Sequence, residues 1–164
     1  MGGWTLVLEL AQNVSTIGLA AFLTTRWPAI KKALTNSHYR LREKLILVVV
    51  FSSFSAVGNW MGIPIFLGAL ANTRIVGPLA GGLLGGPIVG VGAGILGAIP
   101  RYYMGGFTVW ASVISNILAG YLAGWVYNRY GPQRINLKIA AATAFAGEAI
   151  LKLLVLAISQ PFEA

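Results

Sequence analysis

The segment of this chain that says most about its fold is residues 72–106, NTRIVGPLAGGLLGGPIVGVGAGILGAIPRYYMGG. They hold eleven glycines and three prolines in thirty-five positions, and most of the other residues are Ile, Val, Leu or Ala. An arginine stands near each end, Arg74 and Arg101, and no acidic residue lies between the two. The stretch is therefore apolar and rich in helix-breaking residues, yet it is bracketed by two positive charges without a nearby carboxylate.

The glycines and prolines of this stretch predict two short helices that fold back on each other. Gly85-Gly86-Pro87 marks the turn, because proline disfavours helix at the residue before it and glycine permits the turn. We expect helices from about 74 to 84 and from about 88 to 99, with irregular backbone in GIPIFLGALANT before them and in PRYYMGG after them. Small residues recur at every fourth position, which lets helices pack closely in lipid; they are Gly77, Gly81 and Gly85, then Gly86, Gly90, Gly94 and Ala98.

The composition of the 164-residue chain indicates a membrane protein. Hydrophobic residues make up 57% of it and charged residues only 10%, whereas a soluble domain is about a quarter charged. Mean hydropathy is +0.75, and the apolar residues fall in runs of about twenty, which is long enough to cross a bilayer. With the short hairpin, these runs predict an all-α polytopic membrane protein of about six helices, the longer spans being 4–25, 45–63, 107–127 and 137–158.

The basic residues predict which loops face the cytoplasm. Half of the twelve lie between the first two spans, and cytoplasmic loops carry an excess of lysine and arginine. A second basic loop, with Arg129, Arg134 and Lys138, follows the 107–127 span. We therefore place the N-terminus outside the cell. We attribute the net charge of +8 to these loops and not to binding of nucleic acid.

Polar residues from nearly every span are predicted to lie at one depth in the outer half of the membrane. Counting from the basic loops or the hairpin turn, at about 1.5 Å per helical residue, places both arginines roughly 20 Å above the inner face. Polar groups are costly in lipid, so they should face inward and mark a functional site. The layer contains Glu9, Asn59, Arg74, Arg101, Ser112, Ser115 and Asn116, with Glu148 and Lys152 on the last span.

Some residues of this layer also fit a purely structural role, as an alternative to ligand binding. Arg101 also fits an interfacial anchor next to Tyr102 and Tyr103. Glu9 is a candidate counter-ion for one of the arginines, and it also fits a role in helix packing.

Two further pairs in the layer have simple structural interpretations. Glu148 and Lys152 are spaced to neutralise each other on one helix face. Ser112 and Ser115 are also placed to bond the backbone of their own helix, as serine does in membrane helices.

The sequence shows no catalytic, metal-binding or cofactor-binding pattern. It has no cysteine, and its one histidine, His38, lies in the first basic loop. GAGILG at 92–97 formally matches the nucleotide-binding motif G-x-G-x-x-G. No strand is expected before it, and no acidic residue follows about twenty positions later, as that motif requires. We therefore expect neither an enzyme nor a bound cofactor or metal.

The order of motifs resembles one bacterial receptor family. ANTR, then GPLAGGLLGGPIVGVGAGILGAIPRYYMGG and a serine-bearing span are similar to the membrane input domain of LytS/YehU-type sensor histidine kinases, the five-transmembrane LYT receptor family. The N-terminal FLTTRWP and the WMGI stretch at 60–63 agree with this family, so the resemblance covers nearly the whole chain. Pro100 departs from the pattern, because members commonly have histidine there.

The resemblance implies a receptor for small extracellular carboxylates such as pyruvate. Two guanidiniums can bind a carboxylate through forked, charge-assisted hydrogen bonds. The residues implicated in the family correspond here to Arg74, Arg101, Ser112 and Ser115. Relatives can have cysteine at one of the two small polar positions, which leaves the ligand preference open. Ranked behind these four are Asn72, Asn116, Asn59 and Glu9.

The resemblance also implies a larger protein and a location. We expect residues 1–164 to be a single transmembrane sensor domain in the bacterial inner membrane, truncated before a final exit helix and the cytoplasmic kinase region. Its expected partners are the lipid bilayer, a second copy in the full-length kinase and a LytTR-type response regulator. The glycine-rich hairpin also resembles the S-components of energy-coupling-factor vitamin transporters, so the alternative function is a solute-binding subunit of a transporter.

Overall fold

The computed structural model describes residues 40–61, 63–66, 69–71, 73–106 and 108–158, together with Ala11, Ser15, Gly18 and Arg26. Glu9 and Asn72 lie outside the described residues, as does most of the predicted span 4–25. Within the described ranges the chain forms five α helices, a strand pair and one 3-10 turn. Their bounds are α3 Leu41–Trp60, β1 Ile63–Phe66, β2 Ala69–Ala71, α4 Val76–Gly85, α5 Pro87–Met104, α6 Val109–Tyr130, η1 Pro132–Arg134 and α7 Leu137–Ile158.

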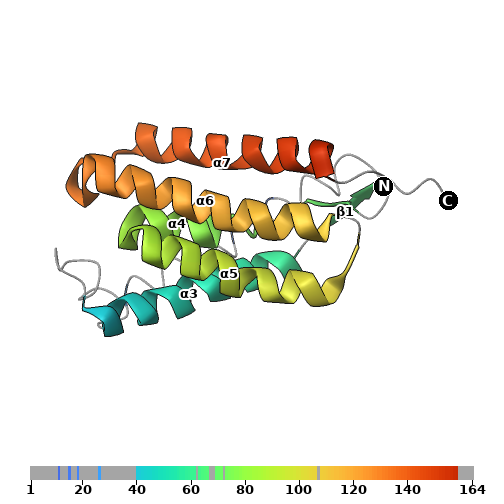
Figure 1. Ribbon diagram of the computed structural model, residues 1–164, viewed down its shortest axis with the longest axis horizontal. Coiled ribbons are helices and arrows are strands. Elements are labelled where there is room, and N and C mark those ends of the chain that lie inside the picture. Colours follow the sequence, from blue (N-terminus) through green and yellow to red (C-terminus); the bar gives the residue numbers. More distant parts are fainter. Residues whose placement is uncertain are drawn as a thin grey trace.

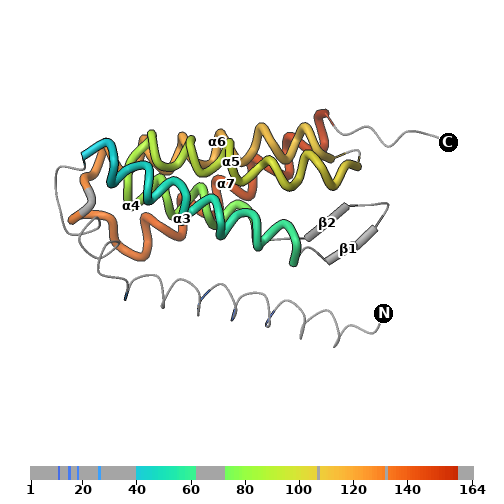
Figure 2. The backbone as a smooth tube through the Cα atoms, turned by 90° about the horizontal axis from the view of Figure 1, so that it is seen from below, coloured from blue at the N-terminus to red at the C-terminus, as the bar shows by residue number. Residues whose placement is uncertain are grey.

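The five helices run side by side along the long axis of the molecule (Figure 1). α4 and α5 lie between α3 and α6, and α7 covers the far side of α6 (Figure 1). α5 packs on both α3 and α6, α4 packs on all three of these helices, and α7 packs mainly on α6. Figure 2 shows α3 running along the α4–α5 hairpin. β1 lies at the end of the bundle at which α3 finishes (Figure 1). The predicted spans from residue 45 onward are thereby confirmed as helices.

The glycine-rich hairpin forms as predicted, and its turn is Gly86. α4 ends at Gly85, α5 begins at Pro87, and Gly86 has a φ of 83°, in the left-handed region that favours glycine. The prediction that the second helix ends near 99 was wrong, because α5 continues through Pro100 to Met104. A proline removes one backbone N–H, a loss that membrane helices tolerate where neighbouring helices pack against them.

The segment between α3 and α4 was predicted to be irregular, but it contains an antiparallel strand pair. β1 pairs with β2 in the register Ile63↔Ala71 and Pro64↔Leu70, and the register shifts after Pro64. The pairing gives partners to backbone N–H and C=O groups that an irregular segment beside the membrane would leave without them.

α5 and α6 approach each other so closely that glycine is required at the contact. A Cβ atom added to Gly120 would collide with the carbonyl group of Gly90, and one added to Gly94 would lie 2.6 Å from the backbone oxygen of Asn116. Gly82 of α4 meets the same part of α6, where an added Cβ would lie 2.7 Å from the Gly120 oxygen. The predicted role of small residues in helix packing is confirmed at Gly90 and Gly94, and Gly82 and Gly120 are two further contact positions that the prediction did not include.

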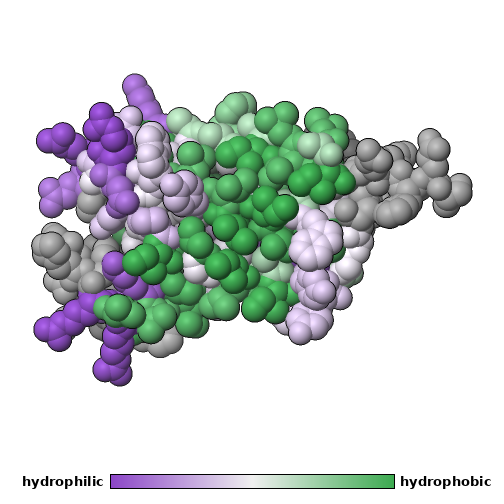
Figure 3. Space-filling view, in the orientation of Figure 1, coloured by the Kyte–Doolittle hydropathy of each residue, from purple (hydrophilic) through white to green (hydrophobic). Residues whose placement is uncertain are grey.

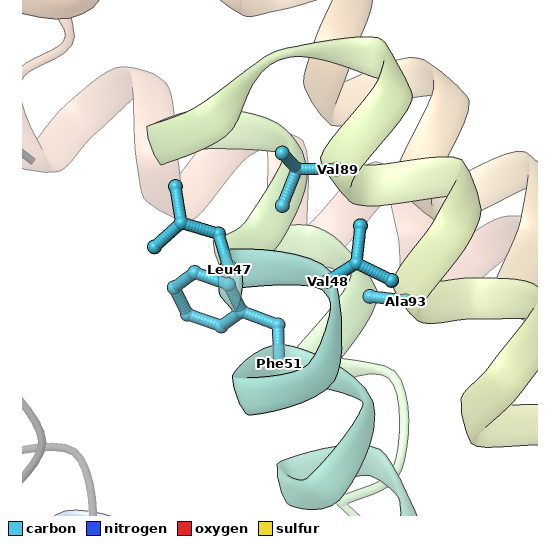
Figure 4. Close-up of a cluster of buried hydrophobic side chains, with 5 residues drawn as sticks. All are labelled: Leu47, Val48, Phe51, Val89 and Ala93. Carbon is cyan, nitrogen blue, oxygen red and sulfur yellow. The ribbon is translucent and has the colours of Figure 1, made fainter. Parts of the chain in front are cut away.

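Two apolar clusters hold the outer helices against the hairpin. The first lies between α3 and α5 and is shown in Figure 4; it consists of Leu47, Val48, Phe51, Val89 and Ala93. The second lies among α4, α6 and α7 and consists of Ile75, Leu79, Ala119, Ala123 and Leu151. Because these clusters fix α3 and α6 relative to α4 and α5, they also fix the polar side chains that the same helices carry.

The surface is banded like that of a membrane protein. Figure 3 shows a hydrophobic belt across the middle of the visible face and a strongly hydrophilic end. By length and composition, α6 and α7 are each able to cross a membrane. The start of α3 and the α6–α7 connection lie at the same end of the bundle (Figure 1). These two segments and the adjoining ends of α6 and α7 carry six of the described basic residues, Arg40, Arg42, Lys44, Arg129, Arg134 and Lys138.

Candidate ligand-binding site

The two predicted arginines lie toward the end of the bundle opposite the basic loops, and both are buried. Arg74 lies in the turn that precedes α4. α4 has ten residues, so it extends about 15 Å from this turn toward the basic end. Arg101 lies in the last turn of α5. Only 3% of Arg74 and 2% of Arg101 are exposed. Charged side chains are almost never buried to this extent unless they are paired, so both positions call for a partner.

Gly58 of α3 lets the backbone of Arg74 come close. A Cβ atom added to Gly58 would lie 2.7 Å from the Arg74 backbone nitrogen and 2.9 Å from its Cα atom. These are main-chain atoms, which cannot swing aside as the end of a side chain can. The close approach at Gly58 therefore fixes the position of the Arg74 Cα atom, from which the side chain extends.

The substitution Gly58→Ala is expected to displace Arg74. The added methyl overlaps main-chain atoms, so the 73–75 turn must shift, at a loss of about 1–3 kcal/mol in unfolding free energy. Thermal unfolding of the purified domain measures this loss, and Ser53→Ala on the exposed side of α3 is the control. An unchanged melting temperature for Gly58→Ala would contradict the close approach.

Arg101 is held by a residue at the start of α6. Its Nη2 atom donates a hydrogen bond of 2.7 Å to the Oγ1 atom of Thr108, which is itself buried. The neighbouring Tyr102 and Tyr103 are 58% and 83% exposed. An interfacial anchor would share the exposure of these tyrosines, so the interpretation of Arg101 as an aromatic-belt residue was wrong.

A polar face of α6 continues inward from Thr108. Ser112, Ser115 and Asn116 are all fully buried. The Ser112 hydroxyl donates to the Thr108 carbonyl oxygen at 2.6 Å, and the Ser115 hydroxyl donates to the Ser112 carbonyl oxygen at 2.9 Å. The predicted backbone bonding of the two serines is confirmed. Their protons are engaged, so in this arrangement their side-chain oxygens are left as acceptors.

Asn59 ties α3 to α5 at the same end of the bundle. Its Nδ2 atom donates to the Gly97 carbonyl oxygen at 2.9 Å, and the residue is fully buried. A carbonyl oxygen requires a donor, so this bond fixes the orientation of the amide. The Oδ1 atom of Asn59 then faces away from the bond, as an acceptor.

Several buried polar atoms of the layer lack a hydrogen-bond partner within the described residues. They come from the turn before α4 and from α3, α5 and α6, and they include a donor from each arginine. Groups of this kind are rare in folded proteins, and each one calls for an explanation. The atoms are Ser55 Oγ, Asn59 Oδ1, Thr73 Oγ1, Arg74 Nε, Arg101 Nε, Asn116 Nδ2 and Asn116 Oδ1.

Within the part of the chain that the structure describes, the positive charges of the two arginines are not neutralised by salt bridges. Arg74 is repelled by the charge of Arg101 and attracted by that of Glu148. The ion pair formed by Glu148 joins it to Lys152 at 4.0 Å, with the two side chains 42% and 72% exposed. The predicted Glu148–Lys152 pair is thus confirmed as a surface pair. Among the described residues, neither arginine has a salt bridge.

Neutralising either member of the Glu148–Lys152 pair is expected to lower the stability by a similar amount. α7 is long and apolar enough to cross a membrane, and a charge left without its partner at the centre of a membrane helix costs about 2.5–3.5 kcal/mol. Glu148→Gln and Lys152→Gln should therefore each lower the unfolding free energy by up to about 3 kcal/mol. Chemical or thermal unfolding of the purified domain checks these values. A clearly larger loss in Glu148→Gln than in Lys152→Gln would identify Glu148 as the structural counter-ion of Arg74.

Besides Thr73, which directly precedes Arg74, the sequence prediction missed two buried polar residues of the layer. Thr108 stands one helical turn before Ser112, and Ser55 stands one turn before Asn59. Both follow the spacing of three or four residues that places side chains on one helix face. Extending the polar stripes by one turn would have found them.

The fold and the site together define a class of protein, a multi-pass helical membrane domain that buries two arginines among its helices. The chain belongs to the family described as 5TMR of 5TMR-LYT, whose model matches residues 27–164. The family membership expected from the glycine-rich motifs is thereby confirmed.

Curated relatives are sensor proteins. The chain is 38% identical to the sensor histidine kinase BtsS of Escherichia coli strain K12, over 99% of this chain and 30% of that protein. It is 34% identical to the sensor protein LytS of Bacillus subtilis strain 168, over 96% and 29% of the two chains. It is 32% identical to the sensor histidine kinase YpdA of Escherichia coli strain K12, over 85% and 23%.

The chain thus spans about 30% of the length of the first of these relatives. No solved structure matches it. The family and the relatives make it a membrane sensor domain of the kind that sensor histidine kinases carry.

Proposed function

We propose that this domain binds a small extracellular carboxylate, such as pyruvate, between the guanidinium groups of Arg74 and Arg101. The observation that carries the proposal is the burial of both arginines without an acidic partner among the described residues. Like charges repel strongly away from water, and buried charges are tolerated when they are paired. A ligand carboxylate would supply the missing negative charge.

The hydrogen-bonding capacity of the arginines suits a carboxylate. Each guanidinium has five N–H donors in a fixed fork, and the Nε donor of each is unpaired among the described residues. Hydrogen bonds to charged groups contribute about 1.5–3 kcal/mol each. Ser112 and Ser115 lie on the adjacent α6 face and complete the proposed site as polar, fully buried walls. Full burial of these walls favours a compact ligand.

Isothermal titration calorimetry of the purified domain tests the proposal. Sodium pyruvate is the ligand, and methyl pyruvate, its uncharged ester, is the control. If the arginines bind the carboxylate, the ester should bind at least about tenfold more weakly, because a charge-assisted contact is lost. Equal affinities for acid and ester, or no binding of pyruvate, lactate or acetate, would overturn the proposal.

The setting of the domain in a longer protein is part of the same proposal. The relatives are sensor histidine kinases, so ligand binding here would control a kinase region reached through a further helix. The partners would be a second copy of the chain and a LytTR-type response regulator. The N-terminus would lie outside a bacterial inner membrane, with the basic end of the bundle in the cytoplasm.

A transporter subunit is the second candidate function. The observation that favours it is the glycine-rich α4–α5 hairpin with its turn at Gly86, the feature on which the expected resemblance to energy-coupling-factor S-components rests. Labelled pyruvate and proteoliposomes distinguish the two functions. Accumulation inside the vesicles supports transport, and binding without accumulation supports sensing.

A further inference from the structure

We propose that Asn116 is the specificity-determining residue of this site, and that its amide recognises the oxygen that a 2-oxo or 2-hydroxy acid carries beside its carboxylate. The inference rests on the proposed function and deepens it. The arginines would select for negative charge, whereas Asn116 would select oxygen-bearing acids against plain carboxylic acids of the same size.

Asn116 is the most unsatisfied polar side chain in the described ranges. It is fully buried, and both its Nδ2 and its Oδ1 atoms lack a hydrogen-bond partner there. Asn59 provides the contrast, because its Nδ2 atom is used on the Gly97 carbonyl. If a buried amide only filled space, an apolar side chain of similar volume at that position would make the domain more stable. The Asn116 amide therefore calls for a partner that binds to it.

Asn116 shares one face of α6 with the residues that hold Arg101. It lies one turn from Ser112 on the same face of α6, and Ser112 is bonded to Thr108, which holds Arg101. The Cα–Cβ bonds of a helix tilt toward its N-terminus, which for α6 is the end at which Thr108 stands. On the other side, Gly94 brings α5 against the Asn116 backbone.

The serines of this face are poorer candidates for the same task. Their hydroxyl protons are donated to backbone carbonyls, so they cannot donate to a keto oxygen without giving up those bonds. Asn116 Nδ2 is the uncharged donor of this face without a partner among the described residues. A keto oxygen accepts from Nδ2, and a hydroxyl group at the same carbon donates to Oδ1. A methylene group does neither.

Three acids with the same three-carbon skeleton and the same charge provide the test. Pyruvate has a keto oxygen, lactate has a hydroxyl group, and propionate has neither. Calorimetry on the wild-type domain is expected to show pyruvate and lactate binding about tenfold more tightly than propionate, the effect of one buried hydrogen bond. In the Asn116→Leu variant the three acids should bind with about equal affinity. The affinity for propionate should stay within about twofold of its value in the wild-type domain.

The melting temperature of the ligand-free variant separates recognition from a structural role. Asn116→Leu should melt at the same or a higher temperature, because it removes two unsatisfied buried atoms. Asn128→Leu on the exposed end of α6 is the matched control and should change neither the preference nor the melting temperature. Asn116→Ala repeats the measurement with a smaller side chain, which cannot overfill the contact with α5.

The outcomes separate this inference from the proposed function. If the wild-type domain binds none of the three acids, the carboxylate site itself is wrong. If all three bind and Asn116→Leu leaves the preference unchanged, or lowers every affinity equally together with the melting temperature, the role of Asn116 is overturned.

Discussion

Replacing Arg74 by alanine is expected to weaken carboxylate binding at least about a hundredfold, while the ligand-free domain keeps its stability or gains some. The affinity falls because a forked, charge-assisted contact in a buried setting is worth about 2–5 kcal/mol, and about 2.7 kcal/mol corresponds to a hundredfold change in Kd. The stability holds because the ligand-free site contains two buried like charges, and the variant removes one of them.

Calorimetry with pyruvate and thermal unfolding measure the two effects in the same preparation. Arg134→Ala, at the exposed basic end of the bundle, is the matched control and should change neither. Arg74→Lys keeps the charge but loses the fork, so it should bind with intermediate affinity. The opposite result, Arg74→Ala unfolding at lower temperature with undiminished ligand affinity, would make Arg74 a structural residue.

Replacing Gly120 by alanine is expected to have the largest effect on stability. The added Cβ would collide with the carbonyl of Gly90 and lie 2.9 Å from the backbone nitrogen of Val91. Main-chain atoms surround the position, so α5 and α6 must move apart. Overpacking of well-packed interiors costs about 1–3 kcal/mol and occasionally more. We expect at least the upper value here, with a fall of many degrees in melting temperature or loss of the folded protein.

Gly147→Ala on α7 is the control for this effect. The nearest atoms to its added Cβ belong to the Leu79 side chain, at 3.3 Å, which can adjust. Alanine is favoured over glycine within a helix by about 1 kcal/mol, so this variant should be as stable as the wild type or slightly more so. Equal stability of the Gly120 and Gly147 variants would show that α5 and α6 are not in close contact.

The sequence was sufficient to predict the helices of the described region because membrane spans are long apolar runs between basic loops. The Gly86 turn was also predictable, since only a glycine followed by proline fits a left-handed residue directly before a new helix. The end of α5 was predicted too early because proline has a low helix propensity. Propensity does not include the packing of neighbouring helices on α5, which keeps its last turn helical beyond Pro100.

The candidate site was predictable in its charges and less so in its hydrogen bonds. Depth counting brought Arg74, Arg101 and the α6 stripe into one layer, because helical rise is constant. It could not reveal that the serine protons are engaged with the backbone while the Asn116 amide is not. That difference depends on side-chain rotamers and on neighbours from other helices. Thr108 was missed because the predicted stripe began one turn too late.

The shortness of α4 leaves room for Arg74 in the same layer as Arg101. The ten residues of α4 pack through Gly82 against Gly120, whereas Arg74 precedes its first residue and Arg101 lies in the last turn of α5. The tight glycine contact and the two arginines of the proposed site are therefore different residues. Energetic effects at positions that share no partner usually add to within about 0.5 kcal/mol. We therefore expect that side chains at the two arginine positions can be exchanged, by drift or by design, without rebuilding the Gly82–Gly120 contact.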